Sequence, residues 1–272
     1  MKSKFELLFD LNKFTFNLAG KLKWIEYFLL HQSAFKKINK AKELVDEQGN
    51  MRKKCYIIGL GPSLKDVNLN KIKGDSFVLN RFFKAGSKYP NFVPTYYHLT
   101  DGQFTNEENI RDFEECMRAY SKKGTRYIMD ATFAEESILK QYETDVFYYI
   151  LSFTGLLNPT KDYYINKPLP ILFNTVCSCI LLAILMGYKE IVLLGCDFNS
   201  FATPMPQHCY EENRKEKLRT LSMELFCYSF AADTHYELQR YAVRNGVKIT
   251  NSTKGSLIDA YPIVVEEELY NI

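Results

Sequence analysis

The stretch Lys54-Cys-Tyr-Ile-Ile-Gly-Leu-Gly-Pro-Ser-Leu-Lys65 decides the fold. It predicts a short buried strand over residues 55–58 and a glycine turn that starts a helix. Gly59 and Gly61 allow a tight turn and a close approach of the backbone to a ligand. Pro62 suits a first helical turn, where no amide hydrogen is needed, and Ser63 adds a hydroxyl. The amides of this turn and the positive end of the helix dipole would then form a seat for a phosphate.

This turn differs from the two best-known phosphate-binding motifs. Leu64 stands where the dinucleotide fingerprint has its third glycine, and the acidic residue expected about 20 positions on is absent. The second expected strand, residues 77–83, instead carries Asn80, whose amide can contact a ribose or a base edge. No Gly-Lys-Ser/Thr follows the turn, which excludes a P-loop. An ordinary strand-to-helix turn remains the alternative to a nucleotide site.

The composition is that of a globular protein. The 272 residues are 46% hydrophobic and 25% charged, enough for one large α/β domain with or without an appendage. The seven cysteines form no CxxC pair, so we expect reduced core thiols of a cytoplasmic protein and no metal site. We expect no signal peptide and no membrane span, since no apolar run reaches about 18 residues. The basic excess sits in the N-terminal helices and is not interleaved with surface aromatic residues, which argues against nucleic-acid binding.

The first part of the chain differs from the rest in charge. Residues 1–54 hold 12 Lys/Arg and 6 Asp/Glu, whereas the remainder holds 23 and 26. The same segment is rich in Phe and Leu, so we predict a basic, amphipathic helical extension over residues 1–52. Such helices could lie on an anionic membrane surface. They could equally form a hairpin packed on the domain or at an oligomer contact.

Residues 53–272 alternate between strand and helix patterns. Strands are expected at 77–83, 95–101, 126–130, 146–151, 191–194 and 247–250, and helices at 106–122, 135–142, 174–186 and 211–245. This order predicts a Rossmann-like α/β fold, with a mainly parallel sheet, helices on both faces and ligands beyond the carboxyl ends of the strands. Polar residues fall at those ends: the glycine turn, Asn80, Asp101 and Asp197.

Three further segments are candidates for the site. Asn174 and Thr175 begin an apolar helix, where they could cap it or present an amide and a hydroxyl to a ligand. Residues 152–172 and 199–215 read as long loops, and a long loop in a compact domain is more often functional than idle. We therefore predict both as active-site loops.

These motifs resemble bacterial sialyltransferases of glycosyltransferase family 42 and related polysaccharide-biosynthesis proteins. The resemblance rests on Gly59-x-Gly-Pro-Ser-Leu64, on Asn80 followed by Phe82-Phe83, and on the block 174–198 with Gly187-Tyr-Lys-Glu-Ile191 and Gly195-x-Asp-Phe198. It extends over residues 54–260 in order, and the N-terminal segment has no counterpart. It implies a single-domain variant of the glycosyltransferase A type that moves a sugar from a CMP-linked donor to an acceptor hydroxyl, with inversion and without a metal.

The resemblance also assigns roles to residues. The glycine turn would hold the CMP phosphate and ribose, Asn80 would contact the nucleotide or the sugar, and Thr175 would contact the sugar carboxylate. The chain departs from the family pattern at two positions. Leu60 replaces an asparagine that contacts the donor, and Asn199 replaces a tyrosine that stabilises the departing phosphate. That last role would pass to Tyr210 or lapse.

The general base has no clear equivalent, although the reaction needs a group that removes the acceptor proton. His31 lies in the N-terminal extension, and His98 reads as a core residue in a strand. His208 follows the strand that ends at Asp197, and His235 lies on a helix; we favour His208.

Two other functions fit the same pattern. A Mg²⁺-dependent pterin diphosphokinase would use Asp101 and Asp197 as metal ligands. A non-catalytic nucleotide-sugar-binding subunit would explain the departures at Leu60 and Asn199. For a transferase we expect surface-polysaccharide synthesis (lipopolysaccharide or capsule) at the inner face of the cytoplasmic membrane. Its partners would be a nucleotide-sugar donor and a glycan acceptor, and a homo-oligomer is compatible with the sequence.

Overall fold

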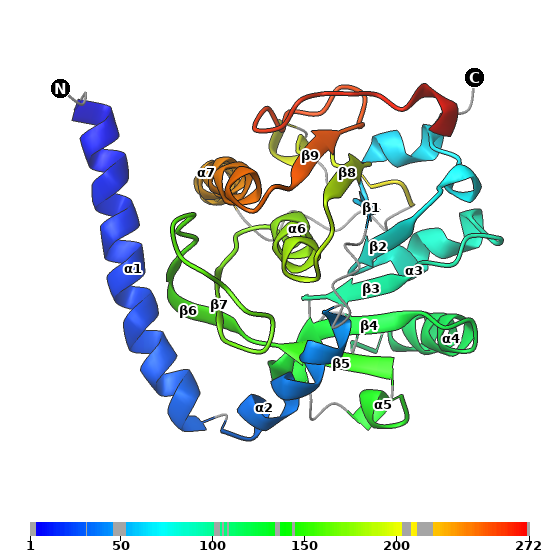
Figure 1. Cartoon of the computed structure of the whole chain (residues 1–272), viewed down its shortest axis with the longest axis horizontal. Coiled ribbons are helices and arrows are strands. Elements are labelled where there is room, and N and C mark those ends of the chain that lie inside the picture. The colour runs from blue at the N-terminus through cyan, green and yellow to red at the C-terminus, as the bar shows by residue number, and fades with distance from the viewer. Residues whose placement is uncertain are drawn as a thin grey trace.

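The protein is a layered α/β structure with a long helix along one side (Figure 1). The computed structural model describes residues 4–30, 32–45, 53–100, 104, 106, 107, 109–133, 137–142, 145–202, 208–210 and 220–270. Within these ranges no helix is long and apolar enough to cross a membrane.

The central sheet confirms the predicted Rossmann-like topology. In the described part of the chain it has seven strands in the order β5-β4-β3-β2-β1-β8-β9, and every neighbouring pair is parallel. The strands are β1 (Lys54–Ile58), β2 (Asp75–Leu79), β3 (Tyr96–Leu99), β4 (Arg126–Asp130), β5 (Val146–Tyr149), β8 (Glu190–Leu194) and β9 (Lys248–Asn251). The chain builds outward from β1 to β5 and then returns to β8 on the other side of β1. This reversal makes the β1–β8 junction the topological switch point, where such sheets bind ligands.

Helices cover both faces of the sheet (Figure 1). One face packs against α6 (Thr175–Leu185) and α7 (Leu221–Arg244), and the other against α3 (Phe82–Ala85) and α4 (Ile110–Ser121). Shorter helical turns are η3 (Leu69–Lys71), η4 (Gly86–Lys88), η6 (Ala131–Phe133), α5 (Ser137–Lys140), η8 (Ser200–Ala202) and η9 (Glu267–Leu269).

Helix α6 shows how the sequence sets these elements. Its residues are apolar on all sides, and nine of them are buried. The Asn174 side chain accepts a hydrogen bond from the Val176 amide at 2.8 Å and so caps the helix. Gly187 follows the other end with a φ of 92°, a conformation that favours glycine. The observed helix therefore agrees with the predicted one within a residue at each end.

The N-terminal extension is helical, as predicted. Helix α1 (Lys4–Leu30) lies beside the sheet layers, and α2 (Gln32–Lys37) and the 3-10 helix η1 (Ile38–Leu44) follow it (Figure 1). Ala41 and Leu44 are fully buried in the core of the domain. Lys40 Nζ also donates a hydrogen bond to the Val146 carbonyl on the edge strand β5, so this part of the extension packs as part of the domain.

Two local expectations need correction, and a third lies partly outside the described residues. The glycine turn leads into a short 3-10 helix, η2 (Pro62–Asp66), and not into an α-helix. Residues 152–172 are not a plain loop, because β6 (Leu151–Leu156) and β7 (Leu169–Ile171) pair there in a small parallel sheet. Helix α7 begins at Leu221 behind the cap Thr220, and residues 211–219 of its predicted length lie outside the described residues.

Candidate functional site

A cavity of about 210 Å³ lies at the switch point of the sheet. It is bounded by the turns after β1, β2 and β8, the start of α6 and one residue of α7. The sequence-predicted residues that line it are Gly59, Gly61, Asn80, Asn174, Thr175, Asp197, Asn199 and His208. Pro62, Ser63, Tyr210 and His235 do not line it, and Asp101 lies outside the described residues.

The two glycines of the turn are required by contact with the loop after β8. A Cβ on Gly59 would stand 2.4 Å from the Gly195 carbonyl oxygen, and a Cβ on Gly61 would stand 1.9 Å from Asp197 Oδ2. The amides of Gly59 and Gly61 donate to the carbonyls of Leu194 and Gly195 at 2.7 and 2.9 Å. The glycines therefore bring two backbone turns together at the switch point.

Four amides of the glycine turn, those of Gly59, Gly61, Ser63 and Leu64, form hydrogen bonds within the protein. The Ser63 amide donates to Asp197 Oδ1 at 3.2 Å and the Ser63 hydroxyl to Oδ2 at 2.7 Å, while the Leu64 amide donates to the Gly61 carbonyl. With Gly59 and Gly61 also bonded internally, these amides are occupied. Burial raises the pKa of the Asp197 carboxyl, and the bonds from Ser63 act against that shift. Asp197 thus holds the turn in place from inside the protein.

A cluster of polar side chains stands at the ends of β2 and β3. Asn80 has a φ of 39° and donates from Nδ2 to Thr175 Oγ1 at 3.1 Å. Its Oδ1 accepts from the Thr100 amide at 3.0 Å, and the hydroxyls of Thr100 and Thr175 are 3.0 Å apart. Asn80 therefore connects the sheet to the first turn of α6. Because this turn carries the positive end of a helix dipole, the cluster is suited to an anionic group.

His208 and Tyr210 differ in their access to the cavity. The two rings stack at 5.0 Å with an angle of 13°, and Tyr210 is buried against the core on the other side. Tyr210 can thus orient His208, but its ring does not face the cavity.

His235 is only 1% exposed and lies in a polar cluster behind the cavity. Its Nδ1 is 3.0 Å from the Tyr261 hydroxyl and its Nε2 is 3.4 Å from Cys177 Sγ. Burial lowers its pKa to about 3, so the ring is neutral, and it packs against Phe198 of the cavity wall. A base needs an open nitrogen near the acceptor, and this geometry gives His235 a supporting position instead. His98 is likewise buried, as expected, with Nε2 2.8 Å from the Tyr149 hydroxyl.

Sequence reasoning missed Tyr228 and Ser200, which line the cavity together. Their hydroxyls form a hydrogen bond, and the Tyr228 ring also contacts Phe198. Tyr228 lies seven residues into α7, where a tyrosine in a helical pattern reads as an ordinary core residue. Only the fold shows that it reaches the switch point.

The described residues contain no group of three or more His, Cys, Asp or Glu side chains placed to hold a metal ion. Of the two acidic residues considered for Mg²⁺, Asp197 is hydrogen-bonded by Ser63. Asp101 is outside the described ranges.

The fold is Rossmann-like, and the cavity lies at the switch point of its sheet, where such folds bind ligands. No family model matches the sequence, and no curated protein matches it. Solved structures do match. CstII sialyltransferase from Campylobacter jejuni in complex with cytidine-5'-monophosphate is 16% identical, with 82% of this chain and 89% of that chain covered and a TM-score of 0.50. The CstII complex with the substrate analogue CMP-3FNeuAc is 17% identical over the same shares, with the same TM-score.

The monofunctional α-2,3-sialyltransferase Cst-I from Campylobacter jejuni is 18% identical, with 82% of this chain and 83% of that chain covered and a TM-score of 0.50. At these identities the likeness shows a shared fold. It confirms at that level the resemblance that the sequence motifs predicted.

Proposed function

We propose that the chain is a glycosyltransferase that moves a sialic-acid-like sugar from a CMP-linked donor to an acceptor hydroxyl, with inversion and without a metal. One observation carries the proposal: eight residues that the motifs assigned to the site converge on one cavity at the switch point of a sialyltransferase fold.

The first turn of α6 is the best seat for the carboxylate of the sugar. The hydroxyl of Thr175 and the amide of Asn80 lie there, at the positive end of an 11-residue helix. This supports the role that the resemblance gave to Thr175. We place the carboxylate here because the amides of Gly59, Gly61, Ser63 and Leu64 in the glycine turn are already hydrogen-bonded within the protein.

Tyr228 and Ser200 are suited to the departing phosphate. Tyr228 on α7 and Ser200 on η8 line the same cavity, and their hydroxyls are hydrogen-bonded to each other. A phenol and an alcohol can donate hydrogen bonds to developing negative charge, which is usually a large contribution to catalysis. Tyr228 would thus stabilise the departing phosphate. It would do so in place of Tyr210, the residue to which the replacement of the family's tyrosine by Asn199 had pointed.

His208 is the base in this proposal. Its ring borders the cavity and is held by stacking on buried Tyr210. The imidazole would accept the proton of the acceptor hydroxyl as that oxygen attacks the anomeric carbon and CMP leaves from the opposite face. His235 would act as a positioning residue through Phe198.

We further propose that the enzyme acts in surface-glycan synthesis at the inner face of the cytoplasmic membrane. The basic excess of residues 1–54 and the exposed apolar side chains of α1 support this location.

A ligand screen followed by one substitution tests the proposal. CMP should raise the melting temperature of the full chain, whereas UDP, GDP and NAD should raise it less, because a ligand that binds only the folded state stabilises it. With CMP-sialic acid as donor, His208→Ala should lower the transfer rate by about 10²–10⁴-fold, as is typical for loss of a general base. His31→Ala serves as the matched control.

Three results would contradict the proposal. A His208→Ala rate within about tenfold of the wild-type rate would remove His208 as base. Activity that depends on added Mg²⁺ would point to pyrophosphate transfer. Binding of CMP without turnover of any CMP-sugar would point to a binding subunit.

A further inference from the structure

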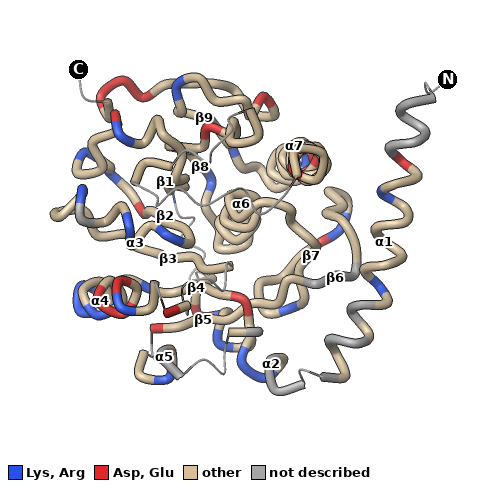
Figure 2. The backbone as a smooth tube through the Cα atoms, turned by 180° about the vertical axis from the view of Figure 1, so that it is seen from behind, with Lys and Arg blue, Asp and Glu red and all other residues tan. Residues whose placement is uncertain are grey.

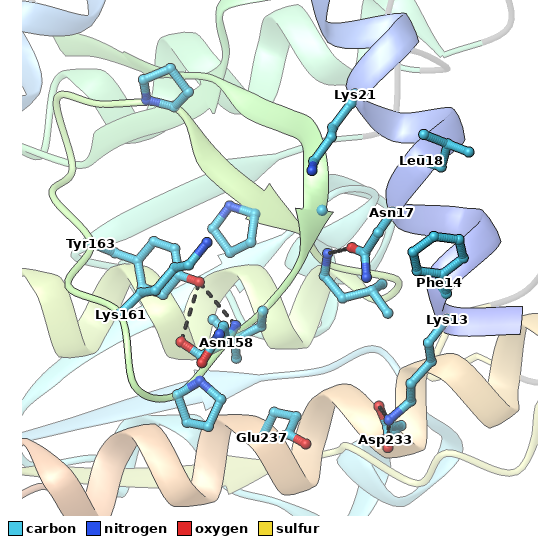
Figure 3. Close-up of a pocket in the computed structure, with 16 residues that line it drawn as sticks. Lys13, Phe14, Asn17, Leu18, Lys21, Asn158, Lys161, Tyr163, Asp233 and Glu237 are labelled. Atoms are coloured by element: carbon cyan, nitrogen blue, oxygen red, sulfur yellow. Dashed lines mark hydrogen bonds and ion pairs between the residues drawn. The ribbon is translucent and has the colours of Figure 1, made fainter. Parts of the chain in front are cut away.

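A second and larger cavity, of about 620 Å³, shares no lining residue with the cavity at the switch point, and Figure 3 shows it in close-up. Its walls are one side of α1, the segment 155–170 that joins β6 to β7, and the side of α7 that carries Asp233 and Glu237. Its volume is within the range of small-molecule sites. The segment that the sequence predicted as an active-site loop therefore faces this cavity.

Direct contacts hold the walls together. Asn17 Oδ1 on α1 accepts a hydrogen bond from the Leu156 amide at 2.7 Å (Figure 3). Gly155 makes room for this contact, since a Cβ there would stand 2.7 Å from the same oxygen. Lys13 Nζ on α1 forms an ion pair with Asp233 of α7 at 2.6 Å. The cavity is thus preformed, which lowers the ordering cost of binding.

The charges in the cavity favour an anion. Its two carboxylates are already engaged, Asp233 by Lys13 and Glu237 by Arg240 at 2.7 Å. Lys21 projects from α1 and Lys161 from the facing segment (Figure 3). Neither ammonium forms an ion pair with any residue that the structure describes. Two cations on opposite walls remain for a ligand.

Among the described side chains of α1 between Leu11 and Leu29, a row of exposed apolar residues runs along the helix. Figure 2 shows the described part of this helix with few charged residues, in contrast to α4. The exposed apolar residues recur at helical spacing and form what we call the α1 stripe: Leu11, Phe14, Leu18, Leu22, Ile25 and Leu29. From Leu11 to Leu29 the stripe spans about 27 Å at 1.5 Å per residue.

The stripe and the cavity meet. Phe14 and Leu18 belong to the stripe, being 64% and 53% exposed, and they also line the cavity, with Lys21 one turn further on. A molecule that fills both places must carry an anionic group beside long apolar chains. The headgroup of an anionic membrane lipid has this chemistry, whereas a soluble anion leaves the stripe uncovered.

We propose that this cavity binds the anionic headgroup of a membrane lipid while the α1 stripe enters the bilayer surface. The proposal rests on the proposed membrane location, but it does not depend on glycosyl transfer. Helices with an apolar face lie in the plane of the interface with that face buried, and nearby lysines attract anionic lipids.

The test is flotation of the full chain with vesicles of phosphatidylcholine alone or with about one third phosphatidylglycerol. The wild type should bind the anionic vesicles and bind the neutral ones weakly. Lys21→Ala combined with Lys161→Ala should reduce the affinity about 30-fold, since each basic residue near such a surface contributes about 1 kcal/mol. The matched control, Lys73→Ala with Lys123→Ala, removes two exposed lysines of the main domain and should change the affinity less than about threefold.

A second variant tests the stripe. Leu18→Ser with Leu22→Ser should abolish vesicle binding while the CMP-induced melting shift is unchanged. The headgroup site would be overturned if both lysine pairs reduced vesicle affinity equally, or if neither reduced it. If the wild type does not bind vesicles but forms a dimer, and the Leu18→Ser, Leu22→Ser protein does not form it, a second copy of the chain covers the stripe and the lipid proposal is wrong. CMP binding without vesicle binding would refute this inference alone, and vesicle binding without CMP binding would refute the proposed function alone.

Discussion

Replacement of Gly59 by alanine would test how closely the two backbone turns approach at the switch point. The added Cβ would stand 2.4 Å from the Gly195 carbonyl oxygen and 2.9 Å from its carbon. This is about 1 Å inside the optimum for non-bonded contact. Because the obstacle is backbone and not a mobile side chain, one of the two turns must move.

The strands leave little room for such a movement. Ile58 is paired with Leu194, and the Gly59 amide donates to the Leu194 carbonyl at 2.7 Å. Overpacking of a filled core costs typically about 1–3 kcal/mol, and loss of the amide bond adds about 1 kcal/mol. We therefore expect Gly59→Ala to lower the free energy of unfolding by about 3 kcal/mol. For a chain of this size this corresponds to a melting temperature lower by about 6–12 °C.

Urea unfolding followed by circular dichroism measures this loss as a lower midpoint with an unchanged slope. The control is Gly86→Ala, because Gly86 has helical backbone angles and its added Cβ would meet only the Tyr120 hydroxyl, at 3.0 Å. That variant should be as stable as the wild type or slightly more stable. A Gly59→Ala protein that unfolds at the wild-type urea concentration would refute the close approach of the two turns.

Two further predictions concern buried polar groups. Asn80→Ala should lower the free energy of unfolding by about 2 kcal/mol, because the Thr100 amide and the Thr175 hydroxyl lose this partner. The CMP affinity measured by calorimetry should fall as well. An unchanged stability would contradict the hydrogen-bonded cluster around Asn80. His98 and His235 have pKa values lowered by burial from 6.5 to about 3, so their contribution to stability is complete above pH 6.5 and is lost as the pH falls toward 3. At about pH 5 each histidine should lower the free energy of unfolding by about 2 kcal/mol. His235→Gln should halve the pH dependence of the urea midpoint. A wild-type midpoint that does not change with pH would refute the lowered pKa of both histidines.

The mainly parallel sheet with helices on both faces could be predicted from the sequence because it depends on local signals. Alternating strand and helix patterns imply right-handed parallel crossovers. The polar residues after the strands then had to meet at one edge of the sheet, as Asn80 and Asp197 do. Helix α6 was equally clear, since its apolar run, its Asn174 cap and Gly187 agree with one another.

The remaining features depend on contacts between distant parts of the chain. The Asp197 carboxylate, 134 residues from Ser63, occupies an amide that would face a ligand if the turn were alone. The buried position of His235 follows from its contacts with Cys177 and Tyr261, which no local pattern indicates. Strands β6 and β7 are short and lie in a segment rich in Tyr, Asn and Pro, so their pairing was hidden.

Helix α7 provides a wall for both cavities. Tyr228 lines the strand-end cavity, and Asp233 and Glu237 line the larger one. These acidic residues lie about 8 and 14 Å further along the axis and on nearly the opposite side of the helix, at 3.6 residues per turn. Phe16 of α1 packs against Phe230 of the same helix at 5.3 Å. If the proposed membrane contact of α1 holds, it would also orient the helix that carries Tyr228, because Phe16 and Phe230 pack together.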